Sequence, residues 1–208
     1  RSAELVLRDN YLQTQAISIA QTRGHLGNEA RASLMRNLEE DGLLKRKIEF
    51  LPSDEEISRR TSLKLSLTRP EMAVLLSYSK IWLYNQLVDS DLPDDEYFRA
   101  DLNRYFPVEM QKKFAKEIEN HKLRRELVAT FVTNSIVNRA GSTFFSTIIK
   151  DTGMKASDIA RSYTITRDMF KLRDLWKAIE DLDGKVEAKV QYQMFLTIGL
   201  FIERQTLW

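Results

Sequence analysis

The stretch TRPEMAVLLSYSKIWLYNQLV, residues 68–88, decides the fold class of this chain. Thr68 and Glu71 have the spacing of a capping box, which closes the first turn of a helix with reciprocal side-chain hydrogen bonds. Pro70 falls in that first turn, where its missing N–H costs nothing. The apolar residues that follow cover more than one face, and such a helix is usually packed by neighbours on several sides. The stretch therefore predicts a central helix of an all-α domain.

Helical patterns also fill most of the remaining chain, separated by glycines, prolines and N-cap residues. Together they predict a multi-helix bundle. Its other expected helices cover about 3–23, 28–41, a short segment from Ser53, a short segment ending at Tyr105, and 108–119, 121–151, 157–163, 168–181 and 186–208. Gly141 interrupts the longest of these, so we expect a kink there, or a place where another helix packs closely.

Residues 43–51 form the only segment that could be a strand, although their apolar residues do not alternate cleanly. We therefore expect one short strand or hairpin near 43–51. The stretch 61–67 has no strong pattern, which predicts a division into an N-terminal helical segment, 1–66, and a larger bundle, 67–208. The chain starts without Met and its last helical pattern ends without a cap, so we expect an excised fragment whose bundle is truncated at its C-terminus.

Composition excludes several classes of function. The 32 basic and 30 acidic residues nearly cancel, so the chain lacks the basic footprint of a nucleic-acid binder. Its purely apolar runs are too short to cross a bilayer. The absence of Cys excludes disulfides and fits the reducing cytoplasm, which is the location we expect. His25 and His121 have no neighbouring ligands, and no glycine-rich loop is present, so we expect no catalytic, cofactor-binding or metal-ligating residue in this chain.

Two helix faces are unusually polar. Arg8, Asn10 and Gln13 lie on the first predicted helix, and Asn134, Asn138 and Arg139 lie on the helix that contains Gly141. A polar row on an otherwise apolar helix must face water or find partners, because an unpaired buried amide costs about 1–3 kcal/mol. Two interpretations stay open for these residues. They are solvated or hydrogen-bonded within the bundle, or they are interdomain contacts to a neighbouring domain.

Residues 38–46 provide an alternative hypothesis. The sequence LEEDGLLKR resembles the passage from recognition helix to wing in winged-helix DNA-binding domains, where basic residues contact phosphates. A wing needs two strands joined by a turn, but Pro52 and a helix cap follow soon after Phe50. A nucleic-acid-binding module built on 38–46 is therefore the weaker interpretation.

Five segments resemble the large-subunit bacterial NAD-specific glutamate dehydrogenases. They are VLRDNYLQTQAIS (6–18), FLPSDEEI (50–57), LTRPEMAVLLSYSKIW (67–82), TFVTNSIVNRAGSTFF (130–145) and DLWKAIEDLD (174–183). The resemblance extends over nearly the whole chain and keeps the order of the segments. Several long segments in register are more specific than a single short motif.

The resemblance implies a parent oxidoreductase that uses NAD to convert L-glutamate into 2-oxoglutarate and ammonia. In that family a long N-terminal region and the dehydrogenase domain precede a helical C-terminal region, which these segments resemble. The lysine motif for substrate and the Rossmann fold for NAD have no counterpart here, so no catalytic or cofactor-binding residue carries over. The resemblance implies a scaffold, oligomer contact or regulator. Its expected partners are the dehydrogenase domain of the same polypeptide and other copies of the parent, with no nucleic acid and no membrane.

Overall fold

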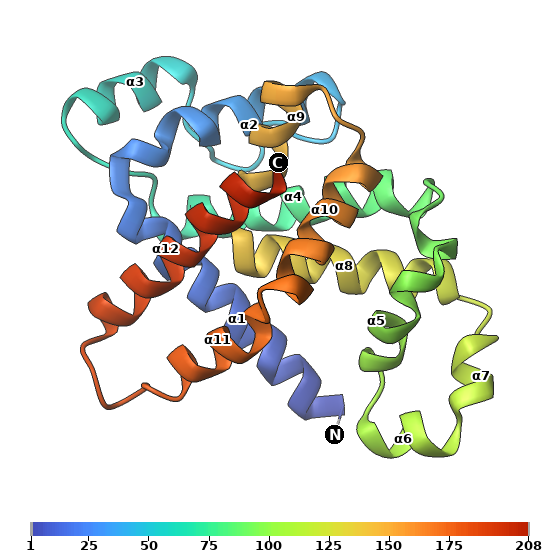
Figure 1. Cartoon of the computed structure of the whole chain (residues 1–208). Coiled ribbons are helices and arrows are strands. Elements are labelled where there is room, and N and C mark those ends of the chain that lie inside the picture. The colour runs from blue at the N-terminus through green and yellow to red at the C-terminus, as the bar shows by residue number, and fades with distance from the viewer. Residues whose placement is uncertain (1, 208) are drawn as a thin grey trace.

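The computed structural model describes residues 2–207, and within this range the chain is helical with no strand. The predicted all-α fold is therefore confirmed (Figure 1). The elements in chain order are α1 (Ser2–Arg23), η1 (Gly24–Gly27), α2 (Asn28–Glu40), α3 (Asp54–Ser62), α4 (Arg69–Val88), η2 (Leu92–Asp94), η3 (Glu96–Phe98), α5 (Arg99–Arg104), α6 (Val108–Lys113), α7 (Ala115–Glu119), α8 (Arg124–Ala140), α9 (Phe144–Thr152), α10 (Ala156–Met169), α11 (Leu172–Glu180) and α12 (Ala188–Thr206).

The predicted central helix is α4. The backbone N–H of Thr68 donates to the Glu71 carboxylate at 2.7 Å, and the Glu71 N–H points back to the Thr68 hydroxyl, so the capping box is confirmed. The helix packs against α1, α2, α8 and α10. Trp82 and Leu83 are buried among these neighbours. A helix that is apolar on several faces is thus covered on several faces.

The predicted helix over 121–151 is divided at Gly141. The first part, α8, ends at Ala140, and α9 begins only at Phe144. Gly141 has a φ of 99°, which an L side chain rarely adopts. The expectation of one kinked helix was therefore wrong, because the backbone leaves the helical region at this glycine. The turn lets α9 pack against α2.

Other boundaries also moved. The predicted helix 108–119 consists of α6 and α7, separated by Phe114, whose φ of −128° is not helical. The helix predicted to stop near residue 163 continues to Met169, and the next one starts at Leu172 after Lys171 in the left-handed conformation. These shifts leave the all-α class unchanged.

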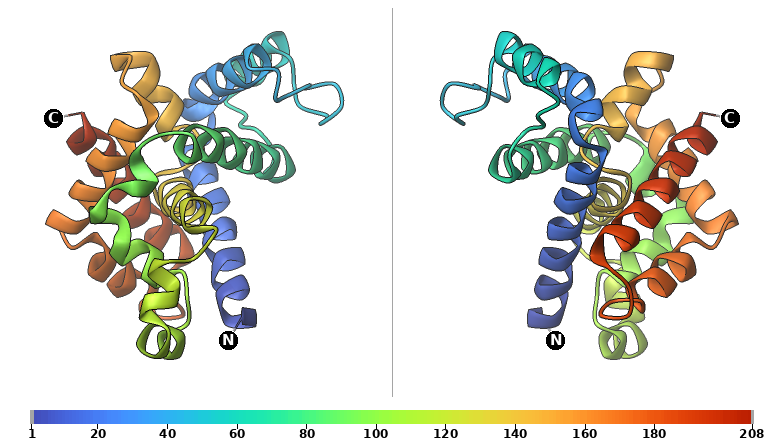
Figure 2. Two further views of the ribbon diagram at one scale, coloured as in Figure 1. Left: turned by 90° about the vertical axis from the view of Figure 1, so that its right-hand side faces the viewer. Right: turned by 90° about the vertical axis from the view of Figure 1, so that its left-hand side faces the viewer.

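The strand or hairpin predicted near 43–51 was wrong. Residues 43–53 form a loop that projects from the body after α2 (Figure 2). Its backbone hydrogen bonds are local: the N–H groups of Leu43 and Leu44 both donate to the Leu38 carbonyl. Leu44 and Leu51 are buried and anchor the two ends of the loop. The apolar residues of this stretch are therefore anchors of a loop and do not form one face of a sheet.

The first helix shares the main core. It packs against α4, α8 and α12, and the views in Figures 1 and 2 show α1 and α12 side by side. The apolar side chains of α2, α4, α8, α9, α10 and α12 belong to one cluster.

The division into 1–66 and 67–208 stays a prediction. Because α1 packs against α4, α8 and α12, a boundary near residue 66 would be crossed by these helix contacts. Residues beyond 207 lie outside the described range, so the predicted truncated end is not described.

Candidate contact surface and internal cavity

Most of the described side chains in the first half of α1 are exposed to solvent. Arg8 and Asn10, two of the predicted contact residues, are exposed, and Gln13 is half-buried. Apolar neighbours are exposed as well: Val6 is 58% and Leu7 is 67% accessible. We call the exposed residues Val6, Leu7, Arg8, Asn10 and Tyr11 the α1 surface. Adjacent apolar side chains left in water on one helix are typical of a surface that meets a partner.

The predicted polar face of α8 lies inside the bundle. Asn134 is half-buried, and Asn138 is only 2% exposed. The Arg139 guanidinium donates to the Glu180 carboxylate at 2.7 Å and to the Gln15 side chain at 3.3 Å, and it lies over the ring of Trp176. Arg139 thus joins α8 to α1 and α11. This arrangement supports the interpretation of a hydrogen-bonded register between helices, which was one of the two left open for this face.

Asn138 is one of the residues that line a hollow of about 60 Å³, open to solvent, between α1, the turn from α8 to α9, and α12. Its side-chain oxygen Oδ1 has no hydrogen-bond partner among the described residues. A buried amide oxygen without a partner costs about 1–3 kcal/mol. The hollow is also lined by Arg23, Arg31, Arg139, Gly199 and Glu203.

Arg31 is the functional residue that the sequence analysis missed. It is 4% exposed, and its guanidinium donates to the carbonyl oxygens of Ala20 at 2.6 Å and Gly24 at 2.9 Å. Further bonds reach the side chains of Asn28 and Ser66. These acceptors are all neutral. Burial, with a smaller contribution from the charge of Arg23, lowers the pKa of Arg31 to about 10. Its position three residues before Leu34, on the apolar stripe of α2, was the signal in the sequence.

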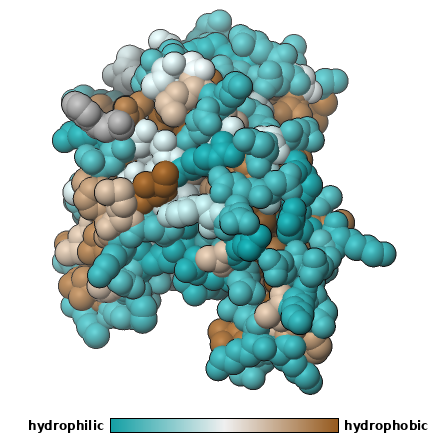
Figure 3. All heavy atoms as spheres, turned by 45° about the vertical axis from the view of Figure 1, so that its right-hand side comes forward, coloured by the Kyte–Doolittle hydropathy of each residue, from teal (hydrophilic) through white to brown (hydrophobic). Residues whose placement is uncertain are grey.

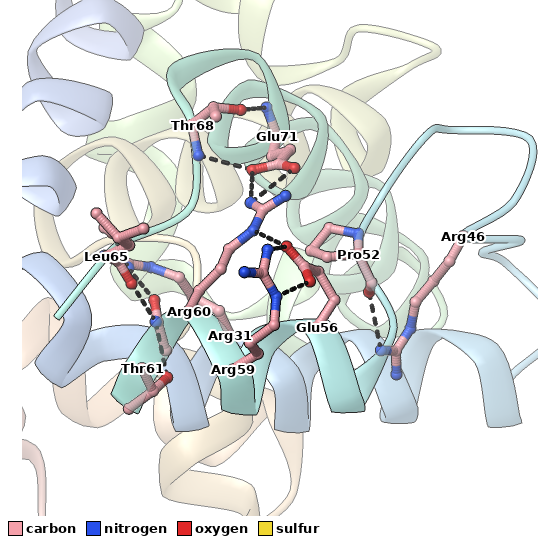
Figure 4. Close-up of polar contacts among 12 residues, drawn as sticks. Arg31, Arg46, Pro52, Glu56, Arg59, Arg60, Thr61, Leu65, Thr68 and Glu71 are labelled. Carbon is pink, nitrogen blue, oxygen red and sulfur yellow. Dashed lines mark hydrogen bonds and ion pairs between the residues drawn. The ribbon is translucent and has the colours of Figure 1, made fainter. Parts of the chain in front are cut away.

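A second arginine attaches α3 to α4. Arg60 bonds to the carboxylates of Glu56 at 2.7 Å and Glu71 at 2.9 Å, as Figure 4 shows. Hydrogen bonds from Arg59 and Arg60 lower the pKa of Glu56 to about 2. The capping carboxylate of α4 therefore also holds α3, so one residue serves two elements.

Of the two basic residues in the 38–46 segment, Lys45 is exposed, and Arg46 is bonded within the chain. Arg46 donates to Glu39 at 2.9 Å and to Asp54 at 2.8 Å, and also to the carbonyl of Pro52, a contact drawn in Figure 4. Its side chain is only 10% exposed. The two strands that a wing requires are absent from residues 2–207. The geometry of residues 38–46 therefore gives no support to the nucleic-acid hypothesis.

A buried ionic cluster joins α5 to α10. Arg167 is 1% exposed and bonds to Asp101 at 3.0 Å and to the neighbouring carboxylate of Asp168 at 2.9 Å. Burial alone would lower the pKa of Arg167, but the hydrogen bonds that it donates to Asp168 and the charge of Asp101 outweigh burial and raise the pKa. Arg173 bonds to the same two aspartates. Each charge has an opposite partner, so this cluster is an internal tie between helices.

The remaining side chains that could bind a metal ion do not gather into one site among the described residues. Across residues 2–207, no group of three or more His, Asp or Glu side chains is placed to hold a metal ion. In the same range, no helix is both long and apolar enough to cross a membrane. The face in Figure 3 is mostly hydrophilic, with small separate apolar patches.

Comparison with known proteins gives consistent matches over the whole chain. The family model described as "Glutamate dehydrogenase, C-terminal" matches residues 64–208. The NAD-specific glutamate dehydrogenases of Halomonas elongata and Pseudomonas aeruginosa are each 42% identical to this chain, over 206 and 204 residues, or 99% and 98% of its length. The NAD-specific glutamate dehydrogenase of Mycobacterium tuberculosis is 34% identical over 177 residues, or 85% of the chain.

These matches cover a small part of each relative. The aligned region is 13% of the Halomonas and Pseudomonas proteins and 11% of the Mycobacterium protein. The family model alone covers more than half of this chain, and the relatives extend the similarity to the residues before it. The chain therefore belongs to the family of glutamate dehydrogenase C-terminal regions.

Proposed function

We propose that this chain is the non-catalytic, helical C-terminal region of an NAD-dependent glutamate dehydrogenase, and that it acts as a scaffold, an oligomer contact or a regulator. The parent would oxidise L-glutamate to 2-oxoglutarate and ammonia with NAD, and the NAD and substrate sites would lie in another domain. The names of the relatives and the small fraction of their length that this chain spans support the proposal.

The observation that carries the contact role is the α1 surface. Leu7 is 67% exposed beside Arg8 and Asn10, whereas the second half of α1 is covered by α4, α8 and α12. We propose that this half of the helix docks onto the dehydrogenase domain of the same polypeptide. A helical bundle influences a reaction elsewhere only if it packs differently against the active and inactive forms of its neighbour. Docking through the α1 surface would provide that coupling.

The test uses the full-length enzyme with Leu7→Asp and, separately, Arg8→Ala. Both residues are exposed in this chain, so neither change should lower its melting temperature by more than about 1–2 °C. If the surface docks, the rate of NAD reduction with glutamate, or the oligomer mass from light scattering, should change several-fold.

The matched control is Met169→Asp, because Met169 is 72% exposed on a different helix, at the end of α10. Equal small effects of all three variants on rate and mass would contradict docking through α1. Glutamate oxidation by the 208-residue chain alone would contradict the non-catalytic assignment.

A further inference from the structure

The outer face of α12 carries a row of exposed apolar side chains. The helix lies at the surface of the bundle beside α1 (Figure 2), and it buries one side against its neighbours through Gln191, Phe195, Ile198, Ile202 and Thr206. On the other side, Val190 is 44% and Met194 is 38% exposed. Thr197 is exposed between them and the end of the helix, and its hydroxyl donates back to the Gln193 carbonyl at 2.9 Å. The polar group of Thr197 is thus satisfied within α12.

These exposed positions have the spacing of a coiled-coil seam. The row advances by four, three and four residues and consists of Val190, Met194, Thr197 and Phe201. Phe201 is half-buried, and its ring meets the ring of Phe170 edge-to-face at a centroid distance of 4.8 Å. Phe170 is 47% exposed, so the apolar surface continues from α12 onto the end of α10. An apolar stripe of this spacing left in water fits the surface of another helix.

Opposite charges lie at the two ends of the row. Glu187 comes three residues before Val190, and Arg204 comes three residues after Phe201, so both continue the same spacing. Both charged side chains are exposed, and neither has an ion-pair partner among the described residues. The row is therefore apolar in its middle, negative where α12 begins and positive where it ends.

This order of charges fits the same row of a second copy in one orientation only. In a parallel pair of α12 helices, Glu187 would face Glu187 and Arg204 would face Arg204, and like charges opposite each other disfavour association. In an antiparallel pair related by a two-fold axis, each Glu187 would face the Arg204 of the second copy, at both ends of the interface. A two-fold interface requires this kind of self-complementarity.

The antiparallel register also matches the apolar residues. When Glu187 is opposite Arg204, Val190 is opposite Phe201 of the second copy, and Met194 is opposite its Thr197. Each layer of the seam therefore joins a larger side chain to a smaller one, which is the arrangement that packs without gaps.

We propose that the α12 row, which is Glu187, Val190, Met194, Thr197, Phe201 and Arg204, pairs antiparallel with the same row of a second copy of this chain. The pairing rests on the oligomer-contact role proposed above and gives that role a surface and a partner. A contact of one helix from each chain is smaller than the interface of a stable dimer, so it is weak between free chains. Further contacts in a longer parent would strengthen it by raising the local concentration of the second copy.

The experiment is sedimentation equilibrium of the 208-residue chain over about a hundredfold range of concentration, up to several hundred micromolar. We expect the average mass to rise reversibly towards that of two chains. Met194→Glu should weaken association at least tenfold and leave the melting temperature unchanged, because Met194 is exposed in the single chain and the pair would bury the new charge. The control is Ile81→Glu, since Ile81 is 48% exposed on α4 and lies outside the row. A chain that stays monomeric at the highest concentration would overturn the proposal, and so would equal effects of the two variants.

Charge reversals test the orientation. Glu187→Arg and Arg204→Glu should each weaken self-association several-fold, because like charges then meet at both ends of an antiparallel pair. An equal mixture of the two variants should associate as the original chain does, since every Arg then faces a Glu. Unchanged association of the single variants would overturn the antiparallel arrangement, and so would a mixture that associates no better than either variant alone.

The outcome is separable from that of the docking test. Docking is tested by variants of α1 in the full-length enzyme, whereas pairing is tested by variants of α12 in the 208-residue chain. A monomeric chain would refute the α12 pairing and leave both the contact through α1 and the non-catalytic assignment as they stand.

Discussion

At the scale of single residues, Arg31 and Gly27 depend on each other. Arg31 is held by hydrogen bonds to Ala20, Gly24 and Ser66, so its guanidinium has little freedom to move. A Cβ at Gly27 would lie 2.9 Å from the Nη2 atom of Arg31. Gly27 has an ordinary φ of −89°, so backbone conformation does not require a glycine there. The glycine is needed because a fixed side chain occupies the space above it.

Gly27→Ala should therefore destabilise the chain by about 1–3 kcal/mol, as an overpacked site does. Gly199→Ala is the matched control, because its Cβ meets no atom within 4 Å, and it should stabilise α12 by up to about 1 kcal/mol. Urea denaturation of the two variants measures both values. Equal effects of the same sign would show that the clash with Arg31 has no energetic weight.

Glu56 makes the free energy of unfolding depend on pH in the acid range. Hydrogen bonds from Arg59 and Arg60 hold its pKa at about 2, whereas an unfolded Glu has a pKa of about 4.3. The lowered value means that its contribution is fully present above about pH 4.3 and is lost as the pH falls towards 2. We expect Glu56→Gln to reduce this acid dependence in melting curves between pH 5 and pH 2. Glu40→Gln, an exposed carboxylate of α2, should leave it unchanged.

Sequence patterns identified some single residues and missed others. The Thr68–Glu71 pair was predictable because a capping box depends on local spacing alone. Arg31 was not, because its acceptors Ala20 and Ser66 come from elements far apart in the chain. Asn138 was chosen as a contact residue for its polarity. Its burial depends on α1 and α12, which the spacing within α8 does not report.

At the scale of elements, the loop 43–53 is held by Arg46. Its guanidinium connects the end of α2, at Glu39, to the start of α3, at Asp54. Phe50, which directly precedes the buried Leu51, is 89% exposed and has a φ of 53°. The loop is therefore held to α2 and α3 by the ion pairs of Arg46, while Phe50 lies in solvent.

Arg46→Gln should loosen the loop without unfolding the bundle. Partly exposed ion pairs contribute about 0–1 kcal/mol each, so the melting temperature should fall by only a few degrees. Amide hydrogen exchange across 43–53 should become faster by tenfold or more. Lys45→Gln, an exposed neighbour, serves as the control. Unchanged exchange in the Arg46 variant would contradict the role of these pairs.

Helix ends were predicted well where the sequence signal is local, and poorly where the backbone depends on contacts with distant residues. Glycine at the end of a helix is a local signal, and Gly153, which follows α9, has a left-handed φ of 69°. Gly141 was read as a kink because the apolar pattern continues through it into α9. The pattern continues because α8 and α9 face the same core, although the backbone turns between them. The predicted strand at 43–51 was wrong because the buried residues Leu44 and Leu51 anchor a loop, and seven positions apart they would lie on opposite faces of a strand.

At the scale of the whole molecule, the first helix belongs to the same core as the last. The packing of α1 against α4, α8 and α12 predicts that residues 67–208 do not fold cooperatively by themselves. Circular dichroism melting of that fragment, compared with the 208-residue chain, measures this. A sharp transition in the fragment at the same temperature would instead favour the predicted boundary near residue 66. Addition of a synthetic peptide of residues 1–23 should restore the transition if α1 supplies the missing contacts.

The contact between α1 and α12 also sets the order of events during synthesis. The buried face of α1 leaves the ribosome first, and its partner helix begins only at Ala188. At about 5–20 residues per second, the apolar half of α1 waits roughly 10–30 seconds for α12. During that interval the nascent chain has an uncovered apolar stripe, so its yield in the cell should depend on translation speed and on chaperones that bind such stripes.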